Sequence, residues 1–178
     1  MPLLALCGLA AAQAQAVLEG PLQVERTDDA LLLAYTLKLE LPPAVDDALH
    51  KGVPLYFVAE AKVIRPRWYW RDAVLARGER TWRLSYQALT RQYRISTGGL
   101  SQSHERLSDA LSAIRRASRW SLPLRDDPQP DVNYEIEFSL RLDTSQLPGP
   151  LQIGLGTGAA IGVSQTRRLH PMELGLAS

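Results

Sequence analysis

The chain has 178 residues, of which 46% are hydrophobic and 22% are charged, and its formal net charge is +1. This composition excludes a disordered chain, and the length predicts one domain. The single cysteine, Cys7, excludes an internal disulfide framework and any zinc site built from cysteines.

Residues 1–16 predict a secretory signal peptide. Residues 3–12 form an apolar stretch, and two Ala-x-Ala cleavage sites follow it, ending at Ala14 and Ala16. A positively charged start is missing, which indicates a truncated n-region. Lipoprotein signals need a small residue before the cysteine, and Leu6 is not small, so we expect no lipidation. We therefore expect an exported, periplasmic protein; the alternative is a buried N-terminal helix.

Four segments alternate apolar and polar residues with period two, which is the pattern of strands with one buried face. They are residues 33–41, 55–63, 82–88 and 132–142. Two other segments break this period. Residues 43–50 predict a short helix that begins at Pro43. Residues 103–119 predict an amphipathic helix with Ser103 as its N-cap, because apolar residues recur at helical spacing: Leu107, Leu111 and Ile114.

These elements predict a mainly β protein with β-sandwich-like antiparallel sheets and the two helices as insertions. We expect one β-rich domain over residues 17–153. Residues 154–178 are rich in Gly and Ala at first and have weak periodicity. We expect this segment to be a tail that is poorly ordered or diverged.

The charge is distributed unevenly along the chain. Residues 65–119 contain twelve arginines and four acidic residues, a local net charge of +8, so the rest of the chain carries −7. Arginine presents fork-shaped donors that suit carboxylate and phosphate groups. Interleaved aromatic residues offer stacking and cation–π contacts. The alternative is a solvated strand face whose arginines pair with the acidic remainder of the chain.

The predicted binding residues are Arg67, Trp68, Trp70, Arg83, Arg91 and Arg94. Three consecutive aromatic residues, 68–70, cannot all face one side of a strand. At least one of them is either covered by a helix or exposed in a patch that suits a protein partner or a membrane interface. We expect Leu84 and Tyr86 in the core and residues 90–92 in a bend between two strands.

Motifs of known enzymes are absent, including the nucleophile elbow, the P-loop, the zinc-protease motif and the dinucleotide fingerprint. We therefore predict a protein that is not an enzyme, with no catalytic residues, no metal and no cofactor. Nucleic acid is not an expected partner, because an exported protein rarely meets it.

Residues 84–94, LSYQALTRQYR, resemble the DUF4390 family of uncharacterised exported proteobacterial proteins, sometimes described as proline-rich signal peptide proteins. Weaker similarities are at residues 52–55, 67–70, 98–100 and 140–148, so the resemblance covers about residues 17–153. It implies a location in the cell envelope and genes beside a membrane sensor histidine kinase, and it implies no catalytic or ligand residues. Family members end in a Trp-containing segment, whereas residues 154–178 contain no aromatic residue.

The expected function is that of an exported accessory or binding module of the cell envelope. Its expected partner is an envelope protein, and the resemblance implies the periplasmic domain of a sensor kinase. The alternative is peripheral contact with anionic lipid or polysaccharide through the arginine and aromatic surface. The sequence leaves the ligand and the oligomeric state open.

Overall fold

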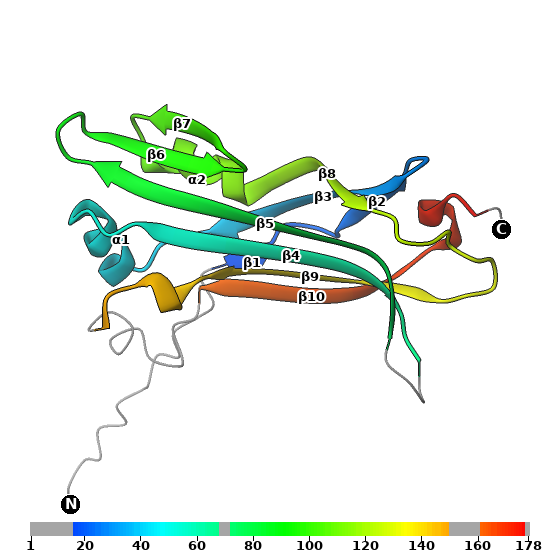
Figure 1. The fold of residues 1–178 in the computed structure, drawn as a ribbon. Helices are drawn as coiled ribbons and strands as arrows, with labels where there is room; N and C mark the ends of the chain where they lie inside the picture. Colours follow the sequence, from blue (N-terminus) through cyan, green and yellow to red (C-terminus); the bar gives the residue numbers. More distant parts are fainter. Residues whose placement is uncertain (1–15, 68–71, 150–160, 177–178) are drawn as a thin grey trace, which may run out of the picture.

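The computed structural model describes residues 16–67, 72–149 and 161–176. They form two antiparallel sheets with two short α-helices, which confirms the predicted mainly β fold (Figure 1). The larger sheet has six strands in the order β10-β9-β4-β5-β6-β7, and in the smaller sheet β3 pairs with β1, β2 and β8. The elements are β1 (Ala16–Leu18), β2 (Gln23–Arg26), β3 (Ala30–Leu39), α1 (Pro43–His50), β4 (Leu55–Arg65), β5 (Ala73–Gln87), β6 (Gln92–Thr97), β7 (Leu100–His104), α2 (Leu107–Arg115), β8 (Arg116–Pro123), β9 (Tyr134–Leu142), η1 (Thr144–Gln146), β10 (Gly162–Leu169) and η2 (Pro171–Leu174).

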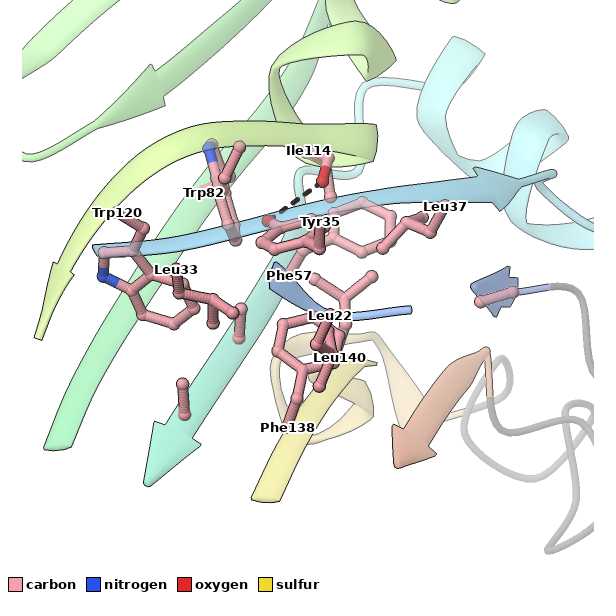
Figure 2. Close-up of a cluster of buried hydrophobic side chains, with 14 of the residues drawn as sticks. Leu22, Leu33, Tyr35, Leu37, Phe57, Trp82, Ile114, Trp120, Phe138 and Leu140 are labelled. Atoms are coloured by element: carbon pink, nitrogen blue, oxygen red, sulfur yellow. Dashed lines mark hydrogen bonds between the residues drawn. The ribbon is translucent and has the colours of Figure 1, made fainter. Parts of the chain in front are cut away.

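The core lies between the two sheets. The alternating positions of β3 meet those of β4 and β9, and the Tyr35 ring lies 4.8 Å from the Phe138 ring (Figure 2). Tyr35 is 3% exposed, and its hydroxyl donates a hydrogen bond to the Ile114 carbonyl at 3.2 Å. Burial raises the pKa of Tyr35 to about 12, although the charge of Arg80 acts in the opposite direction.

The two sheets approach each other closely at Gly78 in the middle of β5. A Cβ atom added there would lie 2.5 Å from Leu122 Cδ2 and 3.3 Å from Trp120 Nε1, both on β8. Beside this contact, the Arg80 guanidinium lies 5.2 Å from the centre of the Trp120 ring. Gly78 therefore lets β8 pack directly onto the backbone of β5.

Both predicted helices are present, but the second is shorter than expected. α1 has the predicted bounds, whereas α2 begins at Leu107 and ends at Arg115. Ser103, the expected N-cap, belongs to β7, and residues 116–119 belong to β8. A β-bulge interrupts the alternation of apolar residues in β8, because Ser118 and Arg119 of β8 lie opposite the single residue Ala34 of β3. The predicted amphipathic helix is therefore present, but both of its predicted ends were wrong.

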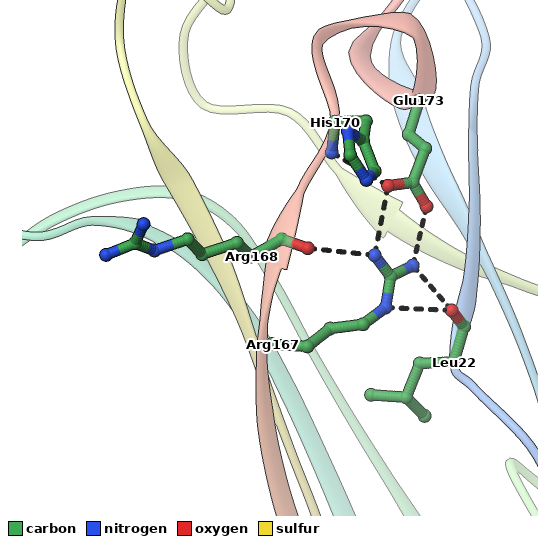
Figure 3. A network of polar contacts seen from close by, with 5 residues as sticks. All are labelled: Leu22, Arg167, Arg168, His170 and Glu173. Atoms are coloured by element: carbon green, nitrogen blue, oxygen red, sulfur yellow. Dashed lines mark hydrogen bonds and ion pairs between the residues drawn. The ribbon is translucent and has the colours of Figure 1, made fainter.

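The segment predicted to be a poorly ordered or diverged tail, residues 154–178, lies partly outside the described residues, and its residues 162–174 form β10 and η2. All eight residues of β10 pair with β9, from Gly162 opposite Arg141 to Leu169 opposite Tyr134. Arg167 of β10 connects two other segments. Its guanidinium donates to the Leu22 carbonyl and to the Glu173 carboxylate in η2 (Figure 3). The apolar alternation is weak because the inward positions of β10 include Gln165 and Arg167.

The predicted signal peptide lies outside the described residues except for its last residue, Ala16. Ala16 begins β1, pairs with Leu39 and is 2% exposed. Cleavage after Ala14 would leave this pairing intact, whereas cleavage after Ala16 would remove it.

Candidate functional site

The outer face of the six-stranded sheet is the face turned away from the core, and most of its charges are paired. Glu60 on β4 lies 3.7 Å from Arg77 and 3.9 Å from Arg141. Two further cross-strand pairs have the same character: Lys62 with Glu137 at 3.2 Å, and Arg168 with Glu135 at 3.7 Å. These ion pairs neutralise the negative charges of the β4 and β9 carboxylates along the middle of this face.

The end of the outer face over β5, β6 and β7 has a different character. Arg83 on β5 pairs with Ser96, and Arg94 on β6 pairs with Ser85, so the two arginines are diagonal neighbours on one face. Arg83 Nε donates to the Tyr56 hydroxyl at 3.2 Å. Neither guanidinium has an ion pair with a carboxylate in the described part of the chain. We call this end the Arg83–Arg94 patch; it comprises Tyr56, Arg83, Ser85, Arg94, Ser96, Ser101 and Ser103.

Serine hydroxyls surround the two arginines. Ser96 and Ser101 lie opposite each other on β6 and β7, with their Oγ atoms 2.6 Å apart, and Ser103 lies opposite Arg94. Guanidinium and hydroxyl groups together offer donors to a carboxylate or phosphate. Both Arg83 and Arg94 are exposed, so each contact is screened by water and salt, and binding needs several groups at once.

The predicted six-residue site is only partly assembled. Arg83 and Arg94 lie together, as described above. Arg91 is exposed in the turn between β5 and β6, where its φ is +53°, and its side chain has no partner in the described ranges. Arg67 lies at the opposite end of β5, which extends roughly 33 Å from Ala73 to Arg83. Trp68 and Trp70 lie outside the described residues.

Several arginines of the basic segment have structural roles instead. Arg115 donates twice to the Leu39 carbonyl, which joins α2 to the end of β3. Arg106 pairs with Asp109 at 3.1 Å in the first turn of α2. Arg80, which is half-buried, lies over the Trp120 ring. The excess of positive charge is therefore spread over both sheets and does not form one continuous surface.

The structure also assembles a cluster that sequence reasoning did not find. His50 at the end of α1 lies 2.8 Å from the Tyr93 hydroxyl through Nε2, and its Nδ1 lies 2.9 Å from the Asp46 carbonyl. The Tyr86 ring lies 4.9 Å from the His50 ring. The i, i+4 spacing of Asp46 and His50 on a helix was visible, but Tyr93 is 43 residues from His50.

The Asp46 carboxylate lies 3.6 Å from His50 Nδ1 without a hydrogen bond, so the acid, imidazole and phenol groups lie close together but do not form a continuous hydrogen-bonded chain. Burial raises the pKa of Tyr93, and the nearby Tyr86 and Asp46 raise it further, so its hydroxyl keeps its proton at neutral pH. The cluster joins α1 to β6 and presents no activated nucleophile. In the described ranges no group of His, Cys, Asp and Glu could hold a metal ion, and no helix is long and apolar enough to cross a membrane.

Comparison with known proteins gives one match. No curated protein and no solved structure matches the chain. The model of a protein family described as "Domain of unknown function (DUF4390)" matches residues 15–161. This range includes the Arg83–Arg94 patch and every strand from β1 to β9, and it ends before β10 begins. Since the match covers most of the sequence, the chain belongs to the DUF4390 family.

Proposed function

We propose that this chain is an exported, non-catalytic binding module of the cell envelope, which contacts a protein partner through the Arg83–Arg94 patch. One observation carries the proposal. Arg83 and Arg94 are exposed diagonal neighbours that have no carboxylate partner among the described residues, on a face where Arg77, Arg141 and Arg168 pair with glutamates. A carboxylate of a partner would supply the missing counter-charge.

A periplasmic location is part of this proposal and rests on the signal segment at residues 1–16. The resemblance to exported family members implies the periplasmic domain of a sensor kinase as the candidate partner. The partner's surface would need acidic groups that meet the patch.

The mixed charge of the outer face favours a protein over a membrane. Anionic lipid headgroups attract a uniformly basic surface. Here Glu60, Glu135 and Glu137 share the face with the arginines. A protein surface can match alternating charges residue by residue, whereas a lipid or polysaccharide with one repeated charge cannot.

Photo-crosslinking in cells tests the proposal. We would place a benzoylphenylalanine at Thr81, which is exposed and two residues from Arg83 on the same face of β5. The tested variant is Arg83→Glu/Arg94→Glu. The matched control is Arg116→Glu/Arg119→Glu, which makes the same charge change at two exposed arginines of β8.

We expect the crosslinked partner to disappear in the first variant and to remain in the control. Equal crosslinking in the wild type and both variants would refute the role of the patch, provided that all three proteins melt at similar temperatures. Cosedimentation with phosphatidylglycerol vesicles tests the alternative: steeply salt-dependent binding that needs Arg83 and Arg94 would favour the lipid function instead.

A further inference from the structure

The six-stranded sheet ends in β10 on one side and in β7 on the other. At the β10 edge, the inward-facing Arg167 donates to the Leu22 carbonyl, which connects this side of the sheet to the segment before β2. At the other edge, β7 pairs with β6 alone, and no other strand in the described parts of the chain pairs with it (Figure 1). An open edge offers unpaired backbone groups to another chain.

The register shows which backbone groups of β7 point outward. Gly98 and Gly99 both have positive φ, +54° and +82°, and form the two-residue turn between β6 and β7. In such a hairpin the residues that flank the turn, Thr97 and Leu100, form a hydrogen-bonded pair. Non-hydrogen-bonded and hydrogen-bonded pairs then alternate along the two strands. The backbone N–H and C=O groups of Ser101 and Ser103 therefore point away from β6. The close Oγ atoms of Ser96 and Ser101 agree with a non-hydrogen-bonded pair.

β7 is short, with five residues, but it lacks three other features that usually protect an edge strand. Residues 100–103 are all exposed, and none of them is charged or proline. The β6–β7 pairing shows no register shift. Leu100 is 74% exposed. Natural edge strands are usually blunted by lysine, proline or a bulge, so β7 has the properties of a strand that accepts a partner.

We propose that β7 accepts an extended segment of the partner protein as a seventh strand, and that this segment carries an acidic side chain on the outer face. This inference rests on the proposed function and names the chemistry of the partner. A residue of the added strand opposite Ser103 would lie two strand spacings, about 10 Å, from Arg94. A glutamate there and the arginine can bridge that separation with their side chains.

A second copy of this chain fits less well at the same edge. Antiparallel pairing of two β7 strands would bring Leu, Ser, Gln and His side chains together. β7 contains no carboxylate, so Arg94 would gain no counter-charge from its copy. The area buried by two five-residue strands is also small beside what a stable dimer needs.

The test uses the exported chain and a fluorescein-labelled peptide, Val-Glu-Val-Glu-Val-Thr, read by anisotropy and by amide hydrogen exchange. Ser103→Pro removes an outward N–H but keeps the ladder with β6, and Ser103→Ala keeps that N–H. We expect the affinity to fall at least tenfold in Ser103→Pro and clearly less in Ser103→Ala, which loses only the hydroxyl. We also expect the peptide to slow amide exchange at Ser101 and Ser103 at least fivefold in the wild type, a readout that needs no variant.

Three results would overturn strand addition: no slowing of exchange at Ser101 and Ser103, equal affinity of folded Ser103→Pro and wild type, or concentration-dependent dimers that Ser103→Pro abolishes. The variant Arg83→Glu/Arg94→Glu separates the two proposals. If this variant loses peptide binding and Ser103→Pro does not, the proposal that the patch binds is supported and the proposal of strand addition is refuted. If Ser103→Pro loses binding and Arg83→Glu/Arg94→Glu does not, the edge is confirmed as the docking strand, while the acidic side chain and the patch are both refuted.

Discussion

Arg167 on β10 and Glu173 in η2 form a two-pronged ion pair, with Arg167 Nη1 lying 3.0 Å from Glu173 Oε2. The same guanidinium donates to the Leu22 carbonyl, and the backbone N–H of His170 donates to Glu173 at 2.8 Å. Both side chains are about one-fifth exposed. This network joins the two ends of the described chain.

The first prediction concerns the pH dependence of this network. Burial alone would raise the pKa of Glu173, but hydrogen bonds from Arg167 and His170 and the charge of Arg167 lower it overall. A lowered pKa adds stability above the ordinary value of a glutamate, and that stability is lost as the pH falls through the folded-state value. We expect Glu173→Gln to lower the free energy of unfolding by about 1–3 kcal/mol at pH 7 and by less in acid.

Urea unfolding at pH 7 and in acid measures this difference. The control is Glu25→Gln, an exposed β2 residue that makes no ion pair in the described ranges, for which we expect little change. Equal losses for the two variants at pH 7 would show that the network contributes nothing specific.

The second prediction concerns Tyr35. Its raised pKa means that the unfolded chain releases the phenol proton at lower pH than the folded chain does. The free energy of unfolding of the wild type should therefore fall as the pH rises from 10 to 12, by roughly 1–3 kcal/mol. Tyr35→Phe should show a smaller fall, because only other groups with a raised pKa, such as Tyr93, remain. It should also be about 1 kcal/mol less stable at pH 7, because the Ile114 carbonyl loses its donor. Denaturation at a series of pH values compares the wild type with Tyr35→Phe. If the free energy of unfolding changes with pH in parallel for the two proteins, the pKa of Tyr35 is not raised by burial.

The third prediction concerns the close approach at Gly78. Leu122, which a new Cβ would meet, is fully buried and has little room to move. We expect Gly78→Val to lower the free energy of unfolding by about 1–3 kcal/mol. Gly149→Ala is the control, since a Cβ there meets nothing within 4 Å. Thermal unfolding compares the two, and similar melting temperatures would argue against tight packing of β8 on β5.

The fourth prediction concerns the order of β10. Leu169 is 7% exposed, whereas its neighbour Arg168 points to the exposed outer face. We expect Leu169→Asn to lower the free energy of unfolding by about 2–4 kcal/mol and Arg168→Asn to lower it by less than about 1 kcal/mol. If the two substitutions have equal and small effects, this part of the chain does not pack as described, and the tail expected from the sequence would be correct.

The fifth prediction concerns processing of the leader. Since Ala16 is buried and paired with Leu39, cleavage after Ala14 preserves β1. Mass spectrometry of the exported chain should therefore find Gln15 at its N-terminus. A mature chain that starts at residue 17 would mean that β1 forms without its first residue.

Local pattern and tertiary context contributed differently to the site. The alternation around Arg83 correctly predicted that this side chain is exposed and that Trp82 and Leu84 are buried. The alternation could not show that Arg94 lies diagonally beside Arg83, because that depends on the register of the β5–β6 hairpin. Arg67, another of the predicted binding residues, does not lie beside them, since the length of β5 separates it from Arg83.

By itself, the sequence determined the alternating strands of the core, the short helix α1 and the family. Each of these is encoded in neighbouring residues, through period two, through helical spacing or through a local motif. Only the tertiary structure decided the order of β10, the strand β8 behind its bulge, and the open edge at β7. These depend on contacts between residues far apart in the chain, such as Arg167 with Leu22, and no local pattern records which distant segment will supply the partner.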